Sequence, residues 1–281
     1  MVSSTHAELL RLMKWPVTWI CVGVWSVMNL FFAYGLNYLT YRGAVSDGKA
    51  GLARLLLADM SPAELPSTLI QGMPMFGGAI VLILAALATG SGYGWSTWKT
   101  VFAQGPHRLA AMGGTLAALV LVVTGVVLLT FALDVAASLV VTSLESRDIV
   151  WPSATDMAEG VAGAFLVMLT FAMAGAWLGV VARSPALSVG LGLVWALVVE
   201  NLLRGVAALL GPLEVVTDVL PGTAAGSLAG ALGATGPGSG APNGTPGVLT
   251  TLAGDSAAAL LAGYVVAFVV LTGILVSRRD A

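Results

Sequence analysis

The stretch that decides the fold runs from Ala110 to Leu133 and reads AAMGGTLAALVLVVTGVVLLTFAL. It carries no charged residue, and it is longer than the roughly 20 apolar residues that a helix needs to cross a hydrocarbon core of about 30 Å. Every backbone N–H and C=O group in that core must bond within the segment, so we predict a transmembrane helix here. Similar stretches lie along the rest of the chain. We predict six spans, at residues 17–39, 69–89, 110–133, 160–182, 186–204 and 257–276.

The composition of the 281-residue chain agrees with this count. Hydrophobic residues make up 58% and charged residues 9%, and the mean hydropathy is +0.94. Soluble proteins carry about 25% charged residues. We therefore expect an all-α polytopic membrane protein with a single transmembrane domain. The fifth span must include Glu200 and Arg204 to cross, and their i, i+4 spacing predicts a polar pair near the outer surface.

The distribution of Lys and Arg predicts how the spans face. An even number of spans puts both termini on one side, and the segments on that side hold seven of the twelve basic residues but only two acids. The positive-inside rule therefore places the termini in the cytoplasm. The expected location is a bacterial inner (plasma) membrane. The seven basic residues on the cytoplasmic side are Arg11, Lys14, Lys99, Arg108, Arg183, Arg278 and Arg279.

Two of the outer loops have distinctive composition. The loop at residues 40–66 has an apolar run at 52–60 that predicts a short surface helix. The longest loop, 205–256, begins with apolar spacing at 212–220, typical of a helix that lies at the interface or dips back into the membrane. Its residues 230–247 are mostly Gly, Pro, Ala, Ser, Thr and Asn. They bury too little apolar surface to fold alone, so we predict a flexible linker there.

The cytoplasmic segment at residues 90–109 reads GSGYGWSTWKTVFAQGPHRL. A helix over residues 95–104 would place Trp95, Trp98 and Phe102 on one face, and Gly105–Pro106 would end it. This predicts a short amphipathic helix at the membrane surface. A plain interfacial anchor is the alternative to a functional role.

Motifs for enzyme chemistry are missing from the sequence. The two histidines, His6 and His107, lie outside the spans, and no H-E-x-x-H or G-x-x-x-x-G-K-[ST] motif occurs. We expect no enzyme activity, no cofactor bound by this chain and no nucleic-acid partner. Asp134, just past the third span, is expected to reach the outer headgroups. A direct transport role for Asp134 or Glu200 is the alternative.

Three short segments carry a resemblance to a known family. Tyr93, Trp95, Thr97, Trp98 and Lys99, followed by Gly105-Pro106 and Arg108, resemble the segment after the second span of ABC-2 type transporter permeases. The N-terminal Glu8-Leu9-Leu10-Arg11 with Lys14 resembles the amphipathic N-terminal helix of that family, and Val219-Leu220-Pro221 resembles the Leu-Pro that follows its fifth span. There are two departures: Gly92 stands where many relatives have Glu, and Ser96 stands where Gly is common.

The resemblance implies the permease subunit of an ATP-driven exporter. Two such subunits, identical or different, would pair, and separate ATPase subunits would bind ATP and Mg²⁺ and dock on the cytoplasmic face. The expected cargo is hydrophobic or amphipathic: a drug, an antibiotic or a lipid. Alternatives are an ATP-independent secondary transporter or channel, and a structural subunit of a membrane complex. The implied ATPase-coupling residues are Trp95, Thr97, Trp98, Lys99, Phe102, Gln104 and Arg108, beside an N-terminal interfacial helix with Glu8, Arg11 and Lys14.

Small residues within the spans allow close contact between helices. They are Gly72, Gly77, Gly78, Gly175 and Gly179. The sequence leaves open whether these contacts join two subunits or helices of one subunit.

Overall fold

The computed structural model describes the chain except residues 1, 96, 104–106, 208–213, 236–243 and 279–281. The side chains of Lys99, Phe102, Ala103 and Glu214 also lie outside the described part. Every regular element in the described ranges is helical. The fold class predicted from composition is thus confirmed at the level of an all-helical protein.

Six helices in the described part are long and apolar enough to cross a membrane, as predicted. They span Pro16–Ser46, Pro62–Gly94, Arg108–Leu144, Ala154–Ala182, Pro185–Ala207 and Gly254–Arg278. Several run beyond the predicted spans, because a helix does not have to stop where the apolar run meets water. The third continues past Leu133 to Leu144, so Asp134 lies inside a helix rather than beyond its end.

Three of the long helices contain a π-helical turn. The first consists of α2 (Pro16–Leu30), η1 (Phe31–Gly35) and α3 (Leu36–Ser46). The second consists of η2 (Pro62–Glu64), α5 (Leu65–Gln71), η3 (Met73–Gly77) and α6 (Gly78–Gly94), and the fifth of α10 (Pro185–Leu193), η4 (Val194–Val199) and α11 (Glu200–Ala207). Pro74 in η3 has no N–H to donate, so the regular hydrogen-bond ladder cannot continue through it. Such π turns often accompany functional sites.

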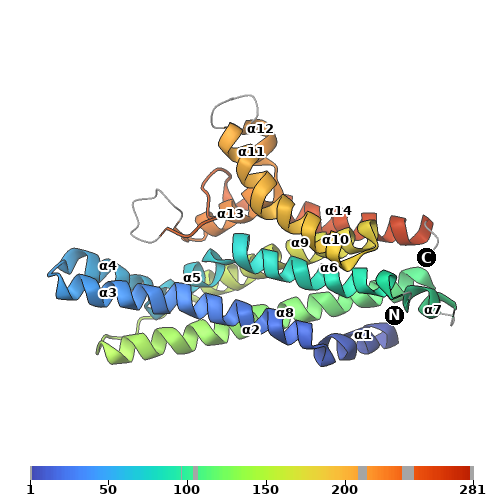
Figure 1. Cartoon of the computed structure of the whole chain (residues 1–281). Helices are drawn as coiled ribbons and strands as arrows, with labels where there is room; N and C mark the ends of the chain where they lie inside the picture. The colour runs from blue at the N-terminus through green and yellow to red at the C-terminus, as the bar shows by residue number, and fades with distance from the viewer. Residues whose placement is uncertain (1, 96, 104–106, 208–213, 236–243, 279–281) are drawn as a thin grey trace.

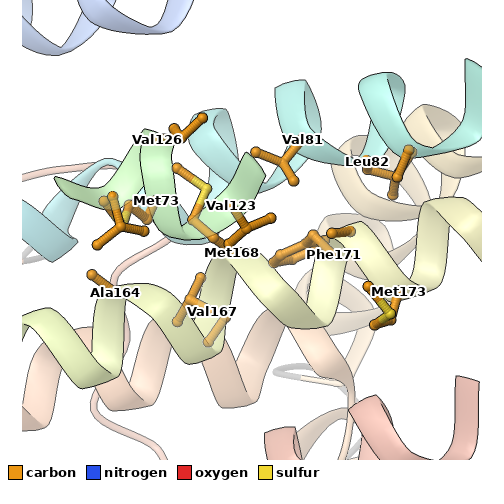
Figure 2. Close-up of a cluster of buried hydrophobic side chains, with 14 of the residues drawn as sticks. Met73, Val81, Leu82, Val123, Val126, Ala164, Val167, Met168, Phe171 and Met173 are labelled. Atoms are coloured by element: carbon orange, nitrogen blue, oxygen red, sulfur yellow. The ribbon is translucent and has the colours of Figure 1, made fainter. Parts of the chain in front are cut away.

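The core lies around the close pairing of α6 with α9 (Ala154–Ala182). A Cβ atom at Gly175 would overlap the carbonyl oxygen of Leu82, and one at Gly179 would overlap the hydroxyl of Thr89. These two glycines therefore bring helices of one subunit together. Gly77 and Gly78 likewise leave room for Met168 and Phe171 of α9. Figure 2 shows Met168 and Phe171 among the side chains of the neighbouring helices.

The two ends of the bundle differ in the elements they hold. Helix α1 (Val2–Lys14), α7 (Thr97–Ala103) and the C-terminal end of α14 (Gly254–Arg278) gather at one end, which we call the termini end (Figure 1). Helix α8 (Arg108–Leu144) runs from there to the opposite end, where α3 and α4 (Ala50–Asp59) form a hairpin. We call this the hairpin end. Helix α4 coincides with the short helix predicted at residues 52–60.

The fifth long helix leaves the bundle at an angle and leads to α12 (Glu214–Asp218) and α13 (Pro221–Ala231) (Figure 1). Helix α13 returns against α14, which packs on α9. The described part of the predicted linker is not free of the fold. Residue 230 lies in α13, the N–H of Thr245 donates to the carbonyl of Thr235 at 2.8 Å, and Val248 is buried. Its remaining residues, 236–243, lie outside the described part.

Candidate functional site

Helix α1 is attached to the bundle by Arg11. The guanidinium donates to the carboxylate of Glu8 at 2.9 Å and to the backbone carbonyl of Ala88 in α6 at 3.0 Å. It also lies over the ring of Trp15, 5.8 Å from the centroid. Leu12 is fully buried, whereas Lys14 is exposed. The structure therefore brings Glu8 and Arg11 together at the end of α6 and leaves Lys14 on the surface.

The segment after the second long helix folds differently from the prediction. Helix α6 continues to Gly94, and Trp95 is its C-cap residue, while α7 begins at Thr97. Trp95 is 73% exposed and Trp98 is 5% exposed. The predicted tryptophan face is therefore wrong for this pair, because the two residues belong to different helices. Of the remaining predicted coupling residues, Thr97 is exposed and Arg108 begins α8. Gln104 and the side chains of Lys99 and Phe102 lie outside the described part.

Trp98 joins α7 to the bundle. Its indole N–H donates to the backbone carbonyl of Thr89 at 3.1 Å, and its ring lies 6.1 Å from that of Tyr93. It packs in a buried cluster with Met112, Val180 and Val276. Helix α7 is thereby connected with α6, α8, α9 and α14.

Gly92 makes this position of Trp98 possible. A Cβ atom on residue 92 would overlap the indole nitrogen of Trp98. The lack of a side chain at Gly92 therefore has a steric consequence: the Trp98 indole occupies the space that a side chain would need. The sequence shows that residue 92 is not an acid, but no sequence pattern indicates that Trp98 occupies the space beside it.

Arg183 is a residue that the sequence analysis did not assign to this site. It ends α9 in the left-handed conformation, with φ of 50°, and its guanidinium lies 5.6 Å from the centroid of the Tyr93 ring. Arg11, Arg108 and Arg183 thus lie at the termini end together with the exposed Trp95. The described part of this end has a surplus of positive charge, because Lys14, Arg108 and Arg183 lie there beside the single Glu8–Arg11 ion pair.

Glu200 belongs to a second polar site, on the fifth long helix. It is 1% exposed, and its carboxylate accepts hydrogen bonds from the indole of Trp195 at 2.9 Å and the backbone N–H of Gly222 at 2.8 Å. Gly222 lies in the first turn of α13, where N–H groups have no partner within the helix. Arg204 instead donates to Asn201 at 2.6 Å. Glu200 and Arg204 do not form an ion pair with each other in the described part of the chain.

Asp134 belongs to a third polar site, in the interior between α2 and α8. It is fully buried and does not extend to a helix end, so the expectation that it reaches the headgroups is wrong. The side-chain amide of Asn29 donates to its carboxylate at 2.6 Å. One turn earlier the indole of Trp25 donates to Thr130 at 2.9 Å. The i, i+4 spacing of these polar pairs on both helices is a signal that sequence reasoning overlooked.

The described residues contain no group of three or more His, Cys, Asp or Glu side chains that could hold a metal ion. Neither the protein-family models nor the curated proteins include a match to this chain.

Proposed function

We propose that this protein is the membrane-spanning subunit of an ATP-driven ABC exporter of the ABC-2 type. In this proposal it moves a hydrophobic or amphipathic substrate across a bacterial inner membrane, with its termini in the cytoplasm. The chain itself performs no ATP chemistry. Separate ATPase subunits bind ATP and Mg²⁺ and dock on the termini end.

One observation carries the proposal. Two peripheral helices at the termini end are fastened by side-chain hydrogen bonds to consecutive carbonyls of α6: Arg11 of α1 bonds Ala88, and Trp98 of α7 bonds Thr89. Helix α6 in turn packs directly on α9. A partner that pushes on α1 and α7 would therefore move the central helix pair, because the force reaches α6 at one point of its length.

The exposed side chains supply further support. Large apolar residues lie open on the first and fifth long helices, among them Trp19, Val27, Leu191 and Val198. Lipid covers such faces, and a second permease subunit can cover part of them. The proposal therefore includes a permease pair, identical or different, embedded in lipid. The positive charge at the termini end is consistent with a cytoplasmic location.

The test is a mild-detergent pull-down of tagged protein from its own host, followed by mass spectrometry. Recovery of a P-loop ATPase subunit in stoichiometric amount supports the proposal. Recovery of this chain alone, at good yield and in several detergents, overturns it.

An ATP-independent secondary transporter is the second candidate. The observation that favours it is the buried Asp134, which has no ion-pair partner among the described residues. Intramembrane acids of this kind occur in proton-coupled carriers. Transport by the purified chain in vesicles, driven by a pH gradient and without ATP, would decide for this candidate.

A further inference from the structure

A cavity of about 280 Å³ lies between the first and second long helices. Trp25, Asn29 and Phe32 line it from α2 and η1, and Gln71 and Phe76 line it from α5 and η3. Residues 244–246 of the last loop close one side. The first long helix begins at Pro16, so Asn29 lies about 20 Å along it. The first long helix spans Pro16–Ser46, about 45 Å in all, so the cavity lies near its middle.

The cavity contains amide groups whose hydrogen bonds are incomplete. Within the described part of the chain the side-chain amide of Gln71 has no hydrogen-bond partner. Asn29 uses its N–H₂ group toward Asp134, while its carbonyl oxygen accepts no hydrogen bond from the described residues. A molecule in the cavity that offers hydrogen-bond donors can bond the carbonyl oxygens of both amides.

The charge beside the cavity favours a cation. Asp134 lies directly behind Asn29, and one of its carboxylate oxygens has no hydrogen-bond partner. No basic side chain among the described residues forms an ion pair with it, and none lines the cavity. The bond from Asn29 to the carboxylate polarises the amide, which makes its carbonyl oxygen a better acceptor. A cation in the cavity would meet this carbonyl oxygen and would lie near the Asp134 carboxyl group.

The walls of the cavity are aromatic. The rings of Phe32 and Phe76 are nearly parallel, 3° apart, with centroids separated by 6.3 Å, and Trp25 lies beside them. Aromatic rings attract cations and pack well on flat apolar groups. An anionic group would meet neither a basic side chain nor a compensating charge here.

We propose that this cavity binds the positively charged, hydrogen-donating end of an amphipathic substrate: a cationic amino group with N–H donors on a flat apolar body. The proposal rests on the exporter function proposed above and specifies its substrate class. Asn29 and Gln71 accept from the amine, the aromatic side chains contact the apolar body, and Asp134 balances the charge. An anionic lipid headgroup is excluded by the same chemistry.

The test uses two dyes with one ring system. Rhodamine 6G is a flat cation with N–H donors, and fluorescein is its anionic counterpart. The purified chain in lipid nanodiscs should bind rhodamine 6G at least about tenfold more tightly than fluorescein by fluorescence anisotropy, after subtraction of empty nanodiscs. Equal binding of the two dyes, or no binding of rhodamine 6G, would overturn the proposal.

Variants test the assignment to this cavity. D134N keeps the shape of the side chain and should weaken rhodamine 6G binding about tenfold. Q71L should weaken rhodamine 6G binding about fivefold. Q71L is the deciding variant if D134N does not fold, because the Gln71 amide bonds no other side chain or backbone group of the described residues. N201L alters an exposed amide on α11 away from the cavity; it is the matched control and should leave the affinity for rhodamine 6G unchanged. Unchanged affinity in Q71L would count against the proposal.

The readout separates this inference from the exporter function. Binding is measured on the permease alone and needs no ATPase. A pull-down without an ATPase would overturn the exporter while leaving dye binding intact. A recovered ATPase together with absent dye binding would overturn only the substrate class.

Discussion

The indole of Trp98 lies where a side chain on residue 92 would have to go. The resemblance described above predicts an acid at this position, and the structure has the Trp98 indole in the space that such a side chain would enter. The tryptophan donates its N–H to Thr89 and fastens α7 to α6. The connection between α7 and the bundle therefore depends on a glycine and an aromatic residue.

Restoring the acid should break this contact. We expect G92E to lower the free energy of unfolding by about 1–3 kcal/mol, because the new side chain overpacks the cluster around Trp98. Thermal unfolding of the purified protein in detergent measures the change. G94E is the matched control, since a Cβ at Gly94 meets only ordinary contacts at 3.4 Å and beyond. Equal effects of the two substitutions would contradict the steric explanation.

The hydrogen bonds from Arg11 and Trp98 to α6 should transmit motion. We expect R11M and W98F, which each remove a donor but keep apolar bulk, to reduce substrate-coupled ATP hydrolysis while the ATPase still docks. Each should also cost about 1 kcal/mol of stability, because a carbonyl of α6 loses its side-chain donor. Measurement of hydrolysis with and without substrate checks this.

The control for these variants is K14M, which alters the exposed end of α1. The exposed side chain of Lys14 forms no hydrogen bond with the described residues of α6, so coupling should stay at the wild-type level. A loss of coupling in K14M as large as that in R11M would show that charge on α1, rather than the bond to Ala88, matters.

Glu200 should stabilise the protein through α13 rather than through Arg204. We expect E200L to cost about 2 kcal/mol, because the N–H groups of Trp195 and Gly222 both lose their acceptor. R204Q should cost less, since among the described residues the hydrogen bond of Arg204 goes to the exposed Asn201. Thermal unfolding of the two variants gives the comparison. A larger loss of stability in R204Q than in E200L would contradict this and would support the ion pair between Glu200 and Arg204 that the sequence predicts.

The contact between α3 and the end of α8 should depend on pH. Hydrogen bonds from Tyr41 and Tyr38 lower the pKa of Glu145, which lies just beyond α8. Because the pKa in the folded state is depressed, the stabilisation is present above the ordinary carboxyl pKa of 4.5 and is lost as the pH falls through the lower value.

Unfolding temperatures across this acidic range should therefore fall less steeply in E145Q than in the wild type. E159Q, which changes an exposed acid on α9, serves as the control and should follow the wild type. An identical pH profile in all three proteins would contradict the role of Glu145.

Cysteine labelling tests the orientation. In a background where Cys21 is replaced by Ala, T155C at the start of α9 should react with a membrane-impermeant reagent in intact cells. S277C at the end of α14 should not react until the cells are opened. Both positions are exposed, so accessibility within the protein does not limit the reaction. The reverse pattern would place the termini outside.

The local patterns of the sequence predicted the helices well but not their ends or their contacts. The six long helices and α4 were expected, because an apolar run of sufficient length is a local property. Trp95 and Trp98 were assigned to one face because their spacing fits one helix, yet α6 continues to Gly94 and separates them. The spacing of two residues shows whether they share a helix face only when both are known to lie in the same helix.

What the sequence alone determined is that the chain has six segments long and apolar enough to cross a membrane as helices, since apolar segments of this length must bond their own backbone in lipid. What only the tertiary structure decided is which polar side chains meet. Asn29 and Asp134 are 105 positions apart, and Glu200 reaches Gly222 across 22. The rotation and approach of whole helices set these pairs, and that packing depends on many side chains at once, which no local pattern contains.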